Sequence, residues 1–282
     1  MVEKQKIIEF IEAGLLEDVG SGDYTSLACI DPLSQAKAEL LIKDTGTIAG
    51  IELARQTFLH LDPDAEFTCI IQDGKDVHHG DVAFQIVCNT LVMLKVERLI
   101  LNTMQRMSGI ATMSSRFAVE VEGTKVKVLD TRKTTPLIRF LEKWAVRIGG
   151  CHNYRDGLYD WIMIKDNHID ACGSIQAAIT RINAYLEKNK LDLGITIEVR
   201  NLVELNEVLE TGGVTRIMLD NFEIPLLKEA VDTVARRFKT EASGGINLQN
   251  VRSYAETGVD YISVGALTHS AGSLDISLNI IK

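Results

Sequence analysis

Charged residues directly follow two apolar, strand-like segments in the middle of the sequence. Val126–Leu129 leads into Arg132 and Lys133, and Trp161–Ile164 leads into Lys165. Basic residues outnumber acidic ones in this region, although the formal net charge of the whole chain is −9. Cations at the ends of buried strands favour a pocket for an anionic small molecule. The alternative, a solvated run of charges, fits less well because these residues do not lie along one helix face.

The cations of this region are of two kinds. Arginine offers a planar fork that matches carboxylate or phosphate, whereas lysine offers a point charge. Several of them together indicate a ligand with more than one negative group. The candidates are Arg132, Lys133, Arg155 and Lys165, with Arg98 as a further one.

Two carboxylates stand at the ends of neighbouring strand-like segments. Glu198 lies near the end of Ile195–Val199, and Asp220 directly follows Arg216–Leu219. Two carboxylates beside a polyanion fit a divalent cation such as Mg²⁺ that bridges them to phosphate. A general-base role for one of them is the competing interpretation, and the residue types alone leave both open.

Glycine-rich turns follow the last two strand-like segments. SGGI spans Ser243–Ile246, and SVGA spans Ser263–Ala266. Glycines after the last two strands of a barrel commonly form a phosphate-binding cradle. One such turn is weak support for a phosphate site, and two in these positions are fairly strong.

Strands and helices alternate regularly through the second half of the sequence. Such alternation predicts right-handed βαβ crossovers and a parallel sheet. The polar candidates fall at the carboxyl ends of successive strands, which is the active face of (β/α) barrels. Six strands rather than eight predict an incomplete or atypical barrel. The expected strands are Val126–Leu129, Trp161–Ile164, Ile195–Val199, Arg216–Leu219, Lys239–Ala242 and Tyr261–Val264. The expected helices are Ile138–Ile148, Ser174–Lys188, Leu202–Glu210, Pro225–Phe238 and Leu248–Glu256.

The first half mixes strands and helices without strict alternation, which predicts an α+β unit of about a hundred residues. It ends in two expected helices, Thr90–Met107 and Gly109–Glu120. The first is apolar over most of its circumference and needs an environment for its one polar stripe. Solvent, a binding site or another subunit would serve equally. The stripe consists of Lys95, Arg98, Asn102 and Arg106.

The turn-rich segment EDVGSGDYTS near the start contains Asp18, Asp23 and Thr25. These residues are candidates for helix caps or for a site, and capping is the favoured interpretation.

The composition excludes several classes of protein. The chain has 282 residues, of which 46% are hydrophobic and 24% charged, as is ordinary for a globular protein. Its acidic balance argues against a nucleic-acid binder that relies on positive potential. No apolar run approaches a membrane span, and the acidic N-terminal segment fits neither a signal nor a transit peptide. Five cysteines without a CxxC pair indicate reduced thiols in a cytoplasmic protein.

Several longer motifs together closely resemble the quinolinate phosphoribosyltransferase family, also called nicotinate-nucleotide pyrophosphorylase (carboxylating). The resemblance covers nearly the whole chain, and LDTRKTTP combined with IMIKDNHI is highly specific. The other matching strings are EDVGSGDYTS, ERLILNTMQRMSGIAT, EKWAVRIGGCHNYRDGLYD, IMLDNF, SGGI and ETGVDYISVGAL.

The resemblance implies an α/β fold and a reaction. Residues 1–110 would form an N-terminal α/β sandwich domain, and a return of the C-terminal segment to this domain is left open. Residues 111–282 would form an open (β/α) barrel of about six or seven parallel strands. The enzyme would be a pentosyltransferase that converts quinolinate and phosphoribosyl pyrophosphate to nicotinate mononucleotide, pyrophosphate and CO₂ in NAD biosynthesis. The family forms homodimers or larger assemblies of dimers, without nucleic-acid or membrane partners.

Carried over position by position, the resemblance assigns the quinolinate clamp to Arg132, Arg155 and Lys165. Arg98 of the neighbouring subunit would complete the clamp. Of the three environments open to the polar stripe, this implies the one at another subunit. Catalytic roles fall on Lys133, near phosphoribosyl pyrophosphate, and on Glu198 and Asp220, which hold Mg²⁺ and the ribose hydroxyls. The remaining substrate-binding positions are Thr131, Ser243, Gly244, Gly245, Val264 and Gly265, with the 5′-phosphate at Ser243, Gly244, Gly245 and Gly265.

One position departs from the family pattern. The family commonly has histidine immediately before the arginine of its NHR motif, whereas Tyr154 precedes Arg155 here. His152 lies two residues earlier, and the sequence does not decide whether either residue touches ligand. No catalytic histidine is therefore carried over. Cys151 is not expected to be a nucleophile because no base is spaced to activate it.

Two other functions compete with this interpretation. A ModD-like protein associated with molybdenum transport genes would share the barrel, but the KDNHI segment favours the quinolinate enzyme. A non-catalytic phosphosugar-binding barrel would not need the metal site, so Glu198, Asp220 and the full cationic set argue against it.

Overall fold

The computed structural model describes residues Lys4–Ile281 and contains two compact units. Unit 1 comprises residues 4–115, 140–150 and 270–281, and unit 2 comprises residues 116–139 and 151–269. The sequence predicted one domain boundary, between residues 110 and 111. The structure differs because two later segments, residues 140–150 and 270–281, also belong to unit 1. Residues 140–150 contribute Glu142, which pairs with Arg106, and residues 270–281 contribute a strand to the sheet of unit 1.

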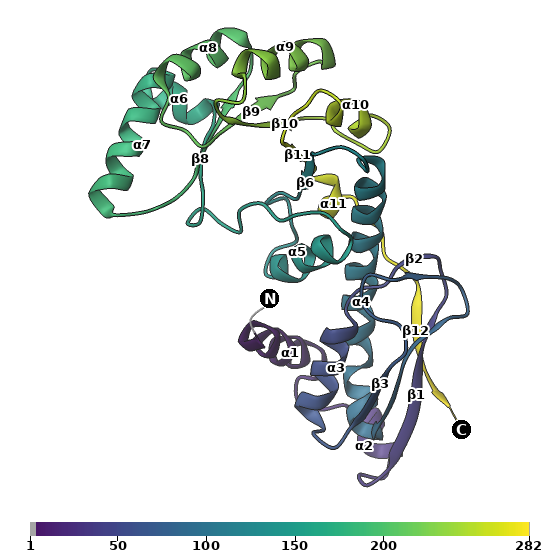
Figure 1. Ribbon diagram of the computed structural model, residues 1–282. Coiled ribbons are helices and arrows are strands. Elements are labelled where there is room, and N and C mark those ends of the chain that lie inside the picture. The colour runs from purple at the N-terminus through teal and green to yellow at the C-terminus, as the bar shows by residue number, and fades with distance from the viewer. Residues whose placement is uncertain (1–3, 282) are drawn as a thin grey trace. The chain divides into compact units, whose positions relative to one another are not determined.

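Unit 1 is built on a four-stranded antiparallel sheet with strand order β12-β1-β5-β3. The C-terminal strand pairs along β1, with Leu40 opposite Leu278. One face of the sheet buries Leu40 and Phe84 against Phe58 and Ile100 of two helices (Figure 1). The strands of unit 1 are β1 Gln35–Ile42, β3 Glu66–Cys69, β5 Val82–Asn89 and β12 Ile276–Ile281, with a separate pair formed by β2 Gly46–Thr47 and β4 Asp76–Val77.

The helices of unit 1 are α1 Lys4–Val19, α2 Tyr24–Cys29, α3 Ile51–Leu61, α5 Arg139–Ile148 and the first part of α4 Thr90–Glu120. The preference for capping is confirmed at Asp23, whose carboxylate accepts a hydrogen bond from Ser26 N at 3.0 Å and caps α2. Hydrogen bonds from the Ser26 hydroxyl and the Ser26 backbone N–H hold the pKa of Asp23 below its usual value. Although α4 has 31 residues, no helix in the described part of the chain is long and apolar enough to cross a membrane.

The expected break between two helices at Ser108 is wrong, because α4 runs through it without interruption. Glycine is tolerated inside a long helix when packing elsewhere supports the helix. Here Gly109 has a packing role, since a Cβ at this position would overlap the carbonyl oxygen of Gly272. The glycine therefore marks a close approach of two backbone segments and not a helix end.

The polar stripe of α4 has more than one environment. Arg106 forms an ion pair of 2.9 Å with buried Glu142 and donates to the carbonyl of Ala271 at 2.8 Å. Arg98 is exposed and makes no hydrogen bond or ion pair with any residue from Lys4 to Ile281. One end of the stripe thus stabilises unit 1, and Arg98 remains available.

Unit 2 confirms the predicted α/β class with an incomplete barrel. Its six strands are all parallel in the order β6-β11-β10-β9-β8-β7. The two edge strands do not pair with each other, so the barrel is open. A bridge between Leu129 and His152 extends the β6 edge by one short step. The strands are β6 Lys127–Leu129, β7 Ile162–Ile164, β8 Ile195–Val199, β9 Arg216–Asp220, β10 Lys239–Ser243 and β11 Tyr261–Ser263.

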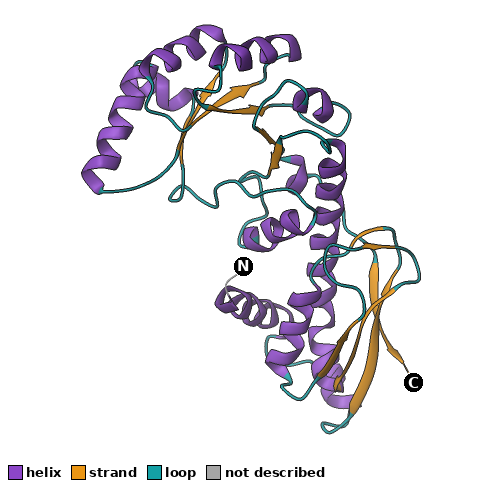
Figure 2. Cartoon of the chain, viewed as in Figure 1, coloured by secondary structure: helices purple, strands orange, loops and turns teal. Residues whose placement is uncertain are grey.

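A helix follows each strand from β7 to β11, whereas the helix after β6, α5, belongs to unit 1. Most helices of unit 2 lie on one side of the sheet, as the purple and orange elements of Figure 2 show. The helices of unit 2 are α6 Asp166–Cys172, α7 Ile175–Asn189, α8 Leu202–Thr211, α9 Ile224–Val234, α10 Val251–Ala255 and α11 Ala266–His269. Two of them, α6 and α11, were not expected from the sequence because each is too short to show a helical period. All six strands were expected, and each βα connection begins on the same edge of the sheet.

Candidate active site

A cavity of about 940 Å³ lies at the carboxyl ends of the parallel strands, wholly within unit 2. All six strands, or the residues directly after them, contribute to its wall. The lining residues are Thr131, Arg132, Lys133, Tyr154, Arg155, Met163, Lys165, Glu198, Met218, Asp220, Asn221, Ser243, Gly244, Gly245, Ile246, Ser263, Gly265, Ala266 and His269.

The loop after β6 supplies two cations. Arg132 and Lys133 are exposed and form no ion pair with any residue between Lys4 and Ile281. The loop is nevertheless fixed, since Lys133 N donates to Thr131 Oγ1 at 3.1 Å and Thr268 Oγ1 donates to the Lys133 carbonyl at 2.8 Å. Two unpaired cations on a fixed loop are positioned to receive anionic groups of a ligand.

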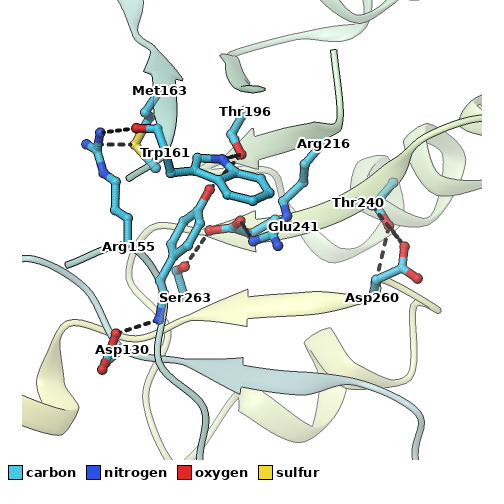
Figure 3. A network of polar contacts seen from close by, with 11 residues as sticks. Asp130, Arg155, Trp161, Met163, Thr196, Arg216, Thr240, Glu241, Asp260 and Ser263 are labelled. Carbon is cyan, nitrogen blue, oxygen red and sulfur yellow. Dashed lines mark hydrogen bonds and ion pairs between the residues drawn. The ribbon is translucent and has the colours of Figure 1, made fainter. Parts of the chain in front are cut away.

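Arg155 is held only by weak acceptors. Its guanidinium donates to the Trp161 carbonyl and to Met163 Sδ, both at 3.4 Å (Figure 3). Burial and then the nearby charge of Arg132 lower the pKa of Arg155 from its ordinary value. Two arginines that repel each other form a site that a dianion would stabilise.

Lys165 stands at the junction of β7 and α6. Its backbone N–H donates to His168 Nδ1 at 3.0 Å, which fixes the start of the helix and the tautomer of the imidazole. Its side chain extends into the cavity and forms an ion pair with Glu198 on β8, with 2.8 Å between Nζ and Oε2. This cation therefore has an acidic partner, unlike those after β6.

Asp220 at the end of β9 accepts two hydrogen bonds. Ser243 Oγ donates to its Oδ1, and Asn221 Nδ2 donates to its Oδ2, each at 2.6 Å. No group of three or more His, Cys, Asp or Glu side chains among the described residues is placed to hold a metal ion. Glu198 and Asp220 nevertheless fit Mg²⁺, because this ion commonly binds through one or two carboxylates and completes its shell with water and substrate phosphates.

The turn after β10 has the conformation of a phosphate cradle. Gly244 and Gly245 have φ values of +95° and +61°, which favour glycine. A Cβ on Gly244 would also overlap Asn221 Oδ1. The N–H groups of Gly244 and Gly245 donate no hydrogen bond within the described chain, so they are available to an anion.

A buried network supports the floor of the cavity beside Arg155 (Figure 3). Trp161 Nε1 donates to Thr196 Oγ1 at 2.8 Å, and Thr196 Oγ1 lies 2.6 Å from the Tyr154 hydroxyl. Because an indole N–H can only donate, the Thr196 proton is free for Tyr154. The Tyr154 hydroxyl in turn bonds to Glu241. Burial raises the pKa of Tyr154, so its hydroxyl stays neutral.

Beneath Tyr154, Arg216 pairs with Glu241 at 2.7 Å, and both residues are buried. The Arg216 guanidinium also lies 4.7 Å from the Tyr154 ring, 5.4 Å from that of Trp161 and 3.8 Å from that of Tyr261. Such cation–π contacts stabilise a buried guanidinium. This arrangement fixes the plane of the Tyr154 ring, which lines the cavity.

One part of the wall is apolar. Tyr154, Met163 and Met218 line the cavity, and none of these side chains carries a formal charge of its own. A flat ring can pack on such a surface. The cavity thus combines an apolar surface with a cationic set and a phosphate cradle.

Most sequence-predicted site residues meet in this cavity. Thr131, Arg132, Lys133, Arg155, Lys165, Glu198, Asp220, Ser243, Gly244, Gly245 and Gly265 all line it. Val264 does not: it is buried and donates to the Leu129 carbonyl at 2.9 Å, which joins β11 to β6. Arg98 belongs to unit 1 and is not a lining residue. Cys151 is buried, and burial raises its thiol pKa to about 12, as expected for a residue that is not a nucleophile.

The sequence interpretation missed several lining residues, and some of them left a signal. Met163 and Met218 stand two residues before Lys165 and Asp220, so strand alternation places each pair on the same face. Asn221 and His269 were also missed, whereas Ile246, Ser263 and Ala266 lie within the two glycine-rich turns for which the sequence predicted a phosphate cradle. His269 follows Gly265 by four residues, but α11 is too short to be expected from sequence.

Comparison with family models gives two matches that together span most of the chain. Residues 23–108 match quinolinate phosphoribosyl transferase, N-terminal domain, and residues 110–279 match quinolinate phosphoribosyl transferase, C-terminal domain.

Two curated relatives and one solved structure illustrate the similarity. Quinolinate phosphoribosyltransferase (decarboxylating) 1b of Nicotiana tabacum is 44% identical over 285 residues, which cover 96% of this chain and 81% of the relative. The probable nicotinate-nucleotide pyrophosphorylase (carboxylating) of Bacillus subtilis (strain 168) is 40% identical over 94% of this chain and 90% of the relative. The crystal structure of NadC from Streptococcus pyogenes has a TM-score of 0.93 at 37% identity and covers 100% of this chain and 99% of that one.

Proposed function

This chain belongs to the quinolinate phosphoribosyltransferase family, and we propose that the cavity of unit 2 is its active site. The enzyme is a pentosyltransferase. It transfers the phosphoribosyl group of phosphoribosyl pyrophosphate to quinolinate with decarboxylation, in NAD biosynthesis. The products are nicotinate mononucleotide, pyrophosphate and CO₂.

The observation that carries the site assignment is the meeting of three surfaces in one cavity. Cations without acidic partners suit a dicarboxylate, the apolar wall suits a flat ring, and the glycine turn suits a phosphate. A phosphosugar-binding site alone would need only the last of these.

The two adjacent carboxylates of quinolinate would bind to Arg132, Arg155 and Lys165. The arginine forks match carboxylates in a way that a lysine does not. The pyridine ring would pack on Tyr154 and Met163. We further propose that Arg98 of a second subunit completes this clamp, since it is exposed and has no partner among residues 4–281 of its own chain.

The phosphoribosyl group would lie at the other side of the cavity. Its 5′-phosphate would accept from the N–H groups of Gly244 and Gly245, with Ser243 and Gly265 beside them. Lys133 and Thr131 would face the pyrophosphate. Val264 would act through the backbone that leads into Gly265, because its own side chain is buried.

Glu198 and Asp220 would hold Mg²⁺ and the ribose hydroxyls. When bound, the ion would supply positive charge to the departing pyrophosphate. The hydrogen bonds from Ser243 and Asn221 orient the Asp220 carboxylate for this role.

The reaction begins when the ring nitrogen attacks C1 of the ribose as its bond to pyrophosphate breaks. Positive character on the ribose is stabilised by the carboxylates, and the departing negative charge by Lys133. The nitrogen becomes a pyridinium and acts as an electron sink. The C2 carboxylate then leaves as CO₂, its bonding electrons remain at C2 beside the pyridinium nitrogen, and a proton takes its place.

Positioning and electrostatics provide most of the rate in this mechanism. The residue before Arg155 supplies no titrating group near neutral pH, because a tyrosine hydroxyl has an ordinary pKa of about 10 and burial raises the pKa of Tyr154 further. Its hydroxyl is also engaged by Thr196 and Glu241. Tyr154 is therefore a wall of the cavity and not a general acid.

We also propose a homodimer or an assembly of dimers in the cytoplasm. Large apolar side chains near the start of the chain support an interface, since Tyr24 is 70% exposed, Leu27 63% and Leu33 89%. The five cysteines are free thiols, which is the state expected in a reducing compartment.

An assay of quinolinate loss tests the function directly. We expect loss of quinolinate absorbance and release of one CO₂ per quinolinate when phosphoribosyl pyrophosphate and Mg²⁺ are present. Chelation of the metal should abolish both, and added Mg²⁺ should restore them. Absence of turnover by the folded protein with both substrates and Mg²⁺ would overturn the proposal.

A further inference from the structure

The ion pair between Lys165 and Glu198 joins the two halves of the active site. Lys165 follows β7, Glu198 lies on the neighbouring strand β8, and Asp220 ends the next strand, β9. On the roles proposed above, Lys165 belongs to the dicarboxylate half and Glu198 to the phosphoribosyl half. Their side chains nevertheless bind each other at 2.8 Å.

This pairing distinguishes Lys165 from the other cations of the cavity. Arg132, Lys133 and Arg155 form no ion pair with residues 4–281 and can receive an anion without giving up an acidic partner. A carboxylate that approaches Lys165 must compete with Glu198 or accept its repulsion. The pair therefore weakens dicarboxylate binding as long as Lys165 is the only partner of Glu198.

The structure allows the side chain of Lys165 to move while its backbone stays in place. The backbone is held by the bond to His168 Nδ1 at 3.0 Å and by the reciprocal bond from His168 N to the Lys165 carbonyl at 2.9 Å. The Lys165 side chain is 46% exposed, whereas that of Glu198 is only 12% exposed. A change of lysine rotamer therefore suffices to exchange one carboxylate partner for another.

We propose that Glu198 is a positioning residue that restrains Lys165 until the phosphoribosyl donor arrives, so that the donor and the dicarboxylate bind with positive cooperativity. When ribose hydroxyls or a cation bind to the Glu198 carboxylate, its ion pair with Lys165 is weakened. The released ammonium group then turns to the dicarboxylate. By thermodynamic reciprocity the dicarboxylate also raises the affinity for the donor by the same factor. This inference rests on the proposed function of the cavity.

The coupling is best measured with a dicarboxylate that cannot react. Benzene-1,2-dicarboxylate has two adjacent carboxylates but no ring nitrogen, so no transfer follows binding. Its dissociation constant can be measured by calorimetry without and with saturating phosphoribosyl pyrophosphate and Mg²⁺. For the wild-type protein we expect the donor to tighten binding about three- to tenfold, the size of effect known for a partly exposed ion pair.

Two variants separate this mechanism from a general effect of charge. Glu198→Gln should bind the dicarboxylate about three- to tenfold more tightly without donor, because Lys165 is already free, and should lose most of the response to donor. Asp170→Asn removes an exposed carboxylate of α6 that neither lines the cavity nor pairs with Lys165. Its affinity without donor should stay within about twofold of the wild-type value. Equal tightening in both variants, or none in Glu198→Gln, would overturn the proposal.

Lys165→Ala provides a test that does not depend on the folding of the Glu198 variant. It should bind the dicarboxylate weakly and show no response to the donor, and a preserved response would contradict the proposal. The absorbance assay with quinolinate distinguishes loss of the enzyme function from loss of the coupling through Glu198. Turnover without coupling would leave the enzyme function intact and refute only the role of Glu198.

Discussion

At the scale of single residues, the proposed active site contains some charged side chains that have partners and others that have none. Arg132, Lys133 and Arg155 stand free of acidic partners in the described chain, and Arg155 is held only by a carbonyl and a thioether. Hydrogen bonds to such acceptors cost little to replace. A dianionic ligand therefore gains charge-assisted bonds and gives up almost nothing in exchange.

Arg132→Ala should abolish quinolinate turnover and leave the fold intact. Loss of one charged partner of a bound carboxylate costs about 2–5 kcal/mol, which lowers kcat/KM by about 30-fold to several thousand-fold. The melting temperature should hardly change, because the Arg132 side chain is exposed and makes no ion pair in the folded chain described here. Steady-state kinetics and a thermal melt measure the two effects. Arg181→Ala, an exposed arginine of α7, is the matched control, and near-normal activity of Arg132→Ala would contradict the assigned clamp.

Gly244→Ala should weaken binding of the phosphoribosyl donor. The added methyl group would overlap Asn221 Oδ1, and the alanine backbone would have to adopt a φ of +95°. We expect KM for phosphoribosyl pyrophosphate to rise about tenfold or more, because the turn would move away from the phosphate. Gly258→Ala has a similar φ of +91° but meets only Val231 Cγ1, at 3.8 Å. This control should lose about 1 kcal/mol of stability and keep its KM; equal effects of the two variants on KM would contradict the assignment.

At the scale of elements, close approaches of backbone decide where helices begin and end. Helix α4 passes through Ser108 and Gly109 without a break, and its glycine lies against Gly272 in the segment that leads to β12. The glycine thus serves the attachment of the C-terminal segment to unit 1. Its helix-breaking tendency of about 1 kcal/mol is offset by this packing.

Gly109→Ala should destabilise the protein although alanine is the better helix former. In an open helical position the change would add up to about 1 kcal/mol of stability. Overlap with the Gly272 carbonyl should instead cost about 2 kcal/mol or more. Chemical denaturation measures the difference. Gly14→Ala in α1 meets only the end of the Leu99 side chain and should stay within about 1 kcal/mol of wild type. A stabilised Gly109→Ala protein would show that the approach to Gly272 is not a constraint.

At the scale of the whole molecule, each unit has its own sheet, and the cavity proposed as the active site is lined by unit 2 alone. Arg98, by contrast, projects from α4 in unit 1 and has no partner among residues 4–281 of its own chain. Arginine is enriched at protein–protein interfaces. The proposed dimer would thus assemble each active site from two chains.

Subunit mixing tests this arrangement. Arg98→Ala and Arg132→Ala should each be inactive alone. If Arg98 acts on the partner's active site, mixed dimers contain one site with both changes and one site with neither. Equal amounts of the two variants, unfolded and refolded together, should recover about a quarter of wild-type activity, since half of randomly assembled dimers are mixed. A mixture that stays inactive would place Arg98 in the site of its own chain.

The sequence by itself determined the family, the alternation of strands and helices in unit 2, and most of the residues that line the proposed site. These features depend on local periodicity and on residues that directly follow strands, so neighbouring letters reveal them. Tertiary structure decided the rest through contacts between distant positions. It placed the C-terminal strand beside β1, kept α4 continuous and separated Arg106 from Arg98 on one stripe. It also joined Lys165 to Glu198, which are 33 residues apart, and locked the Tyr154 hydroxyl onto Thr196. No local pattern encodes such pairs, because each depends on where two strands meet and on what burial does to the groups between them.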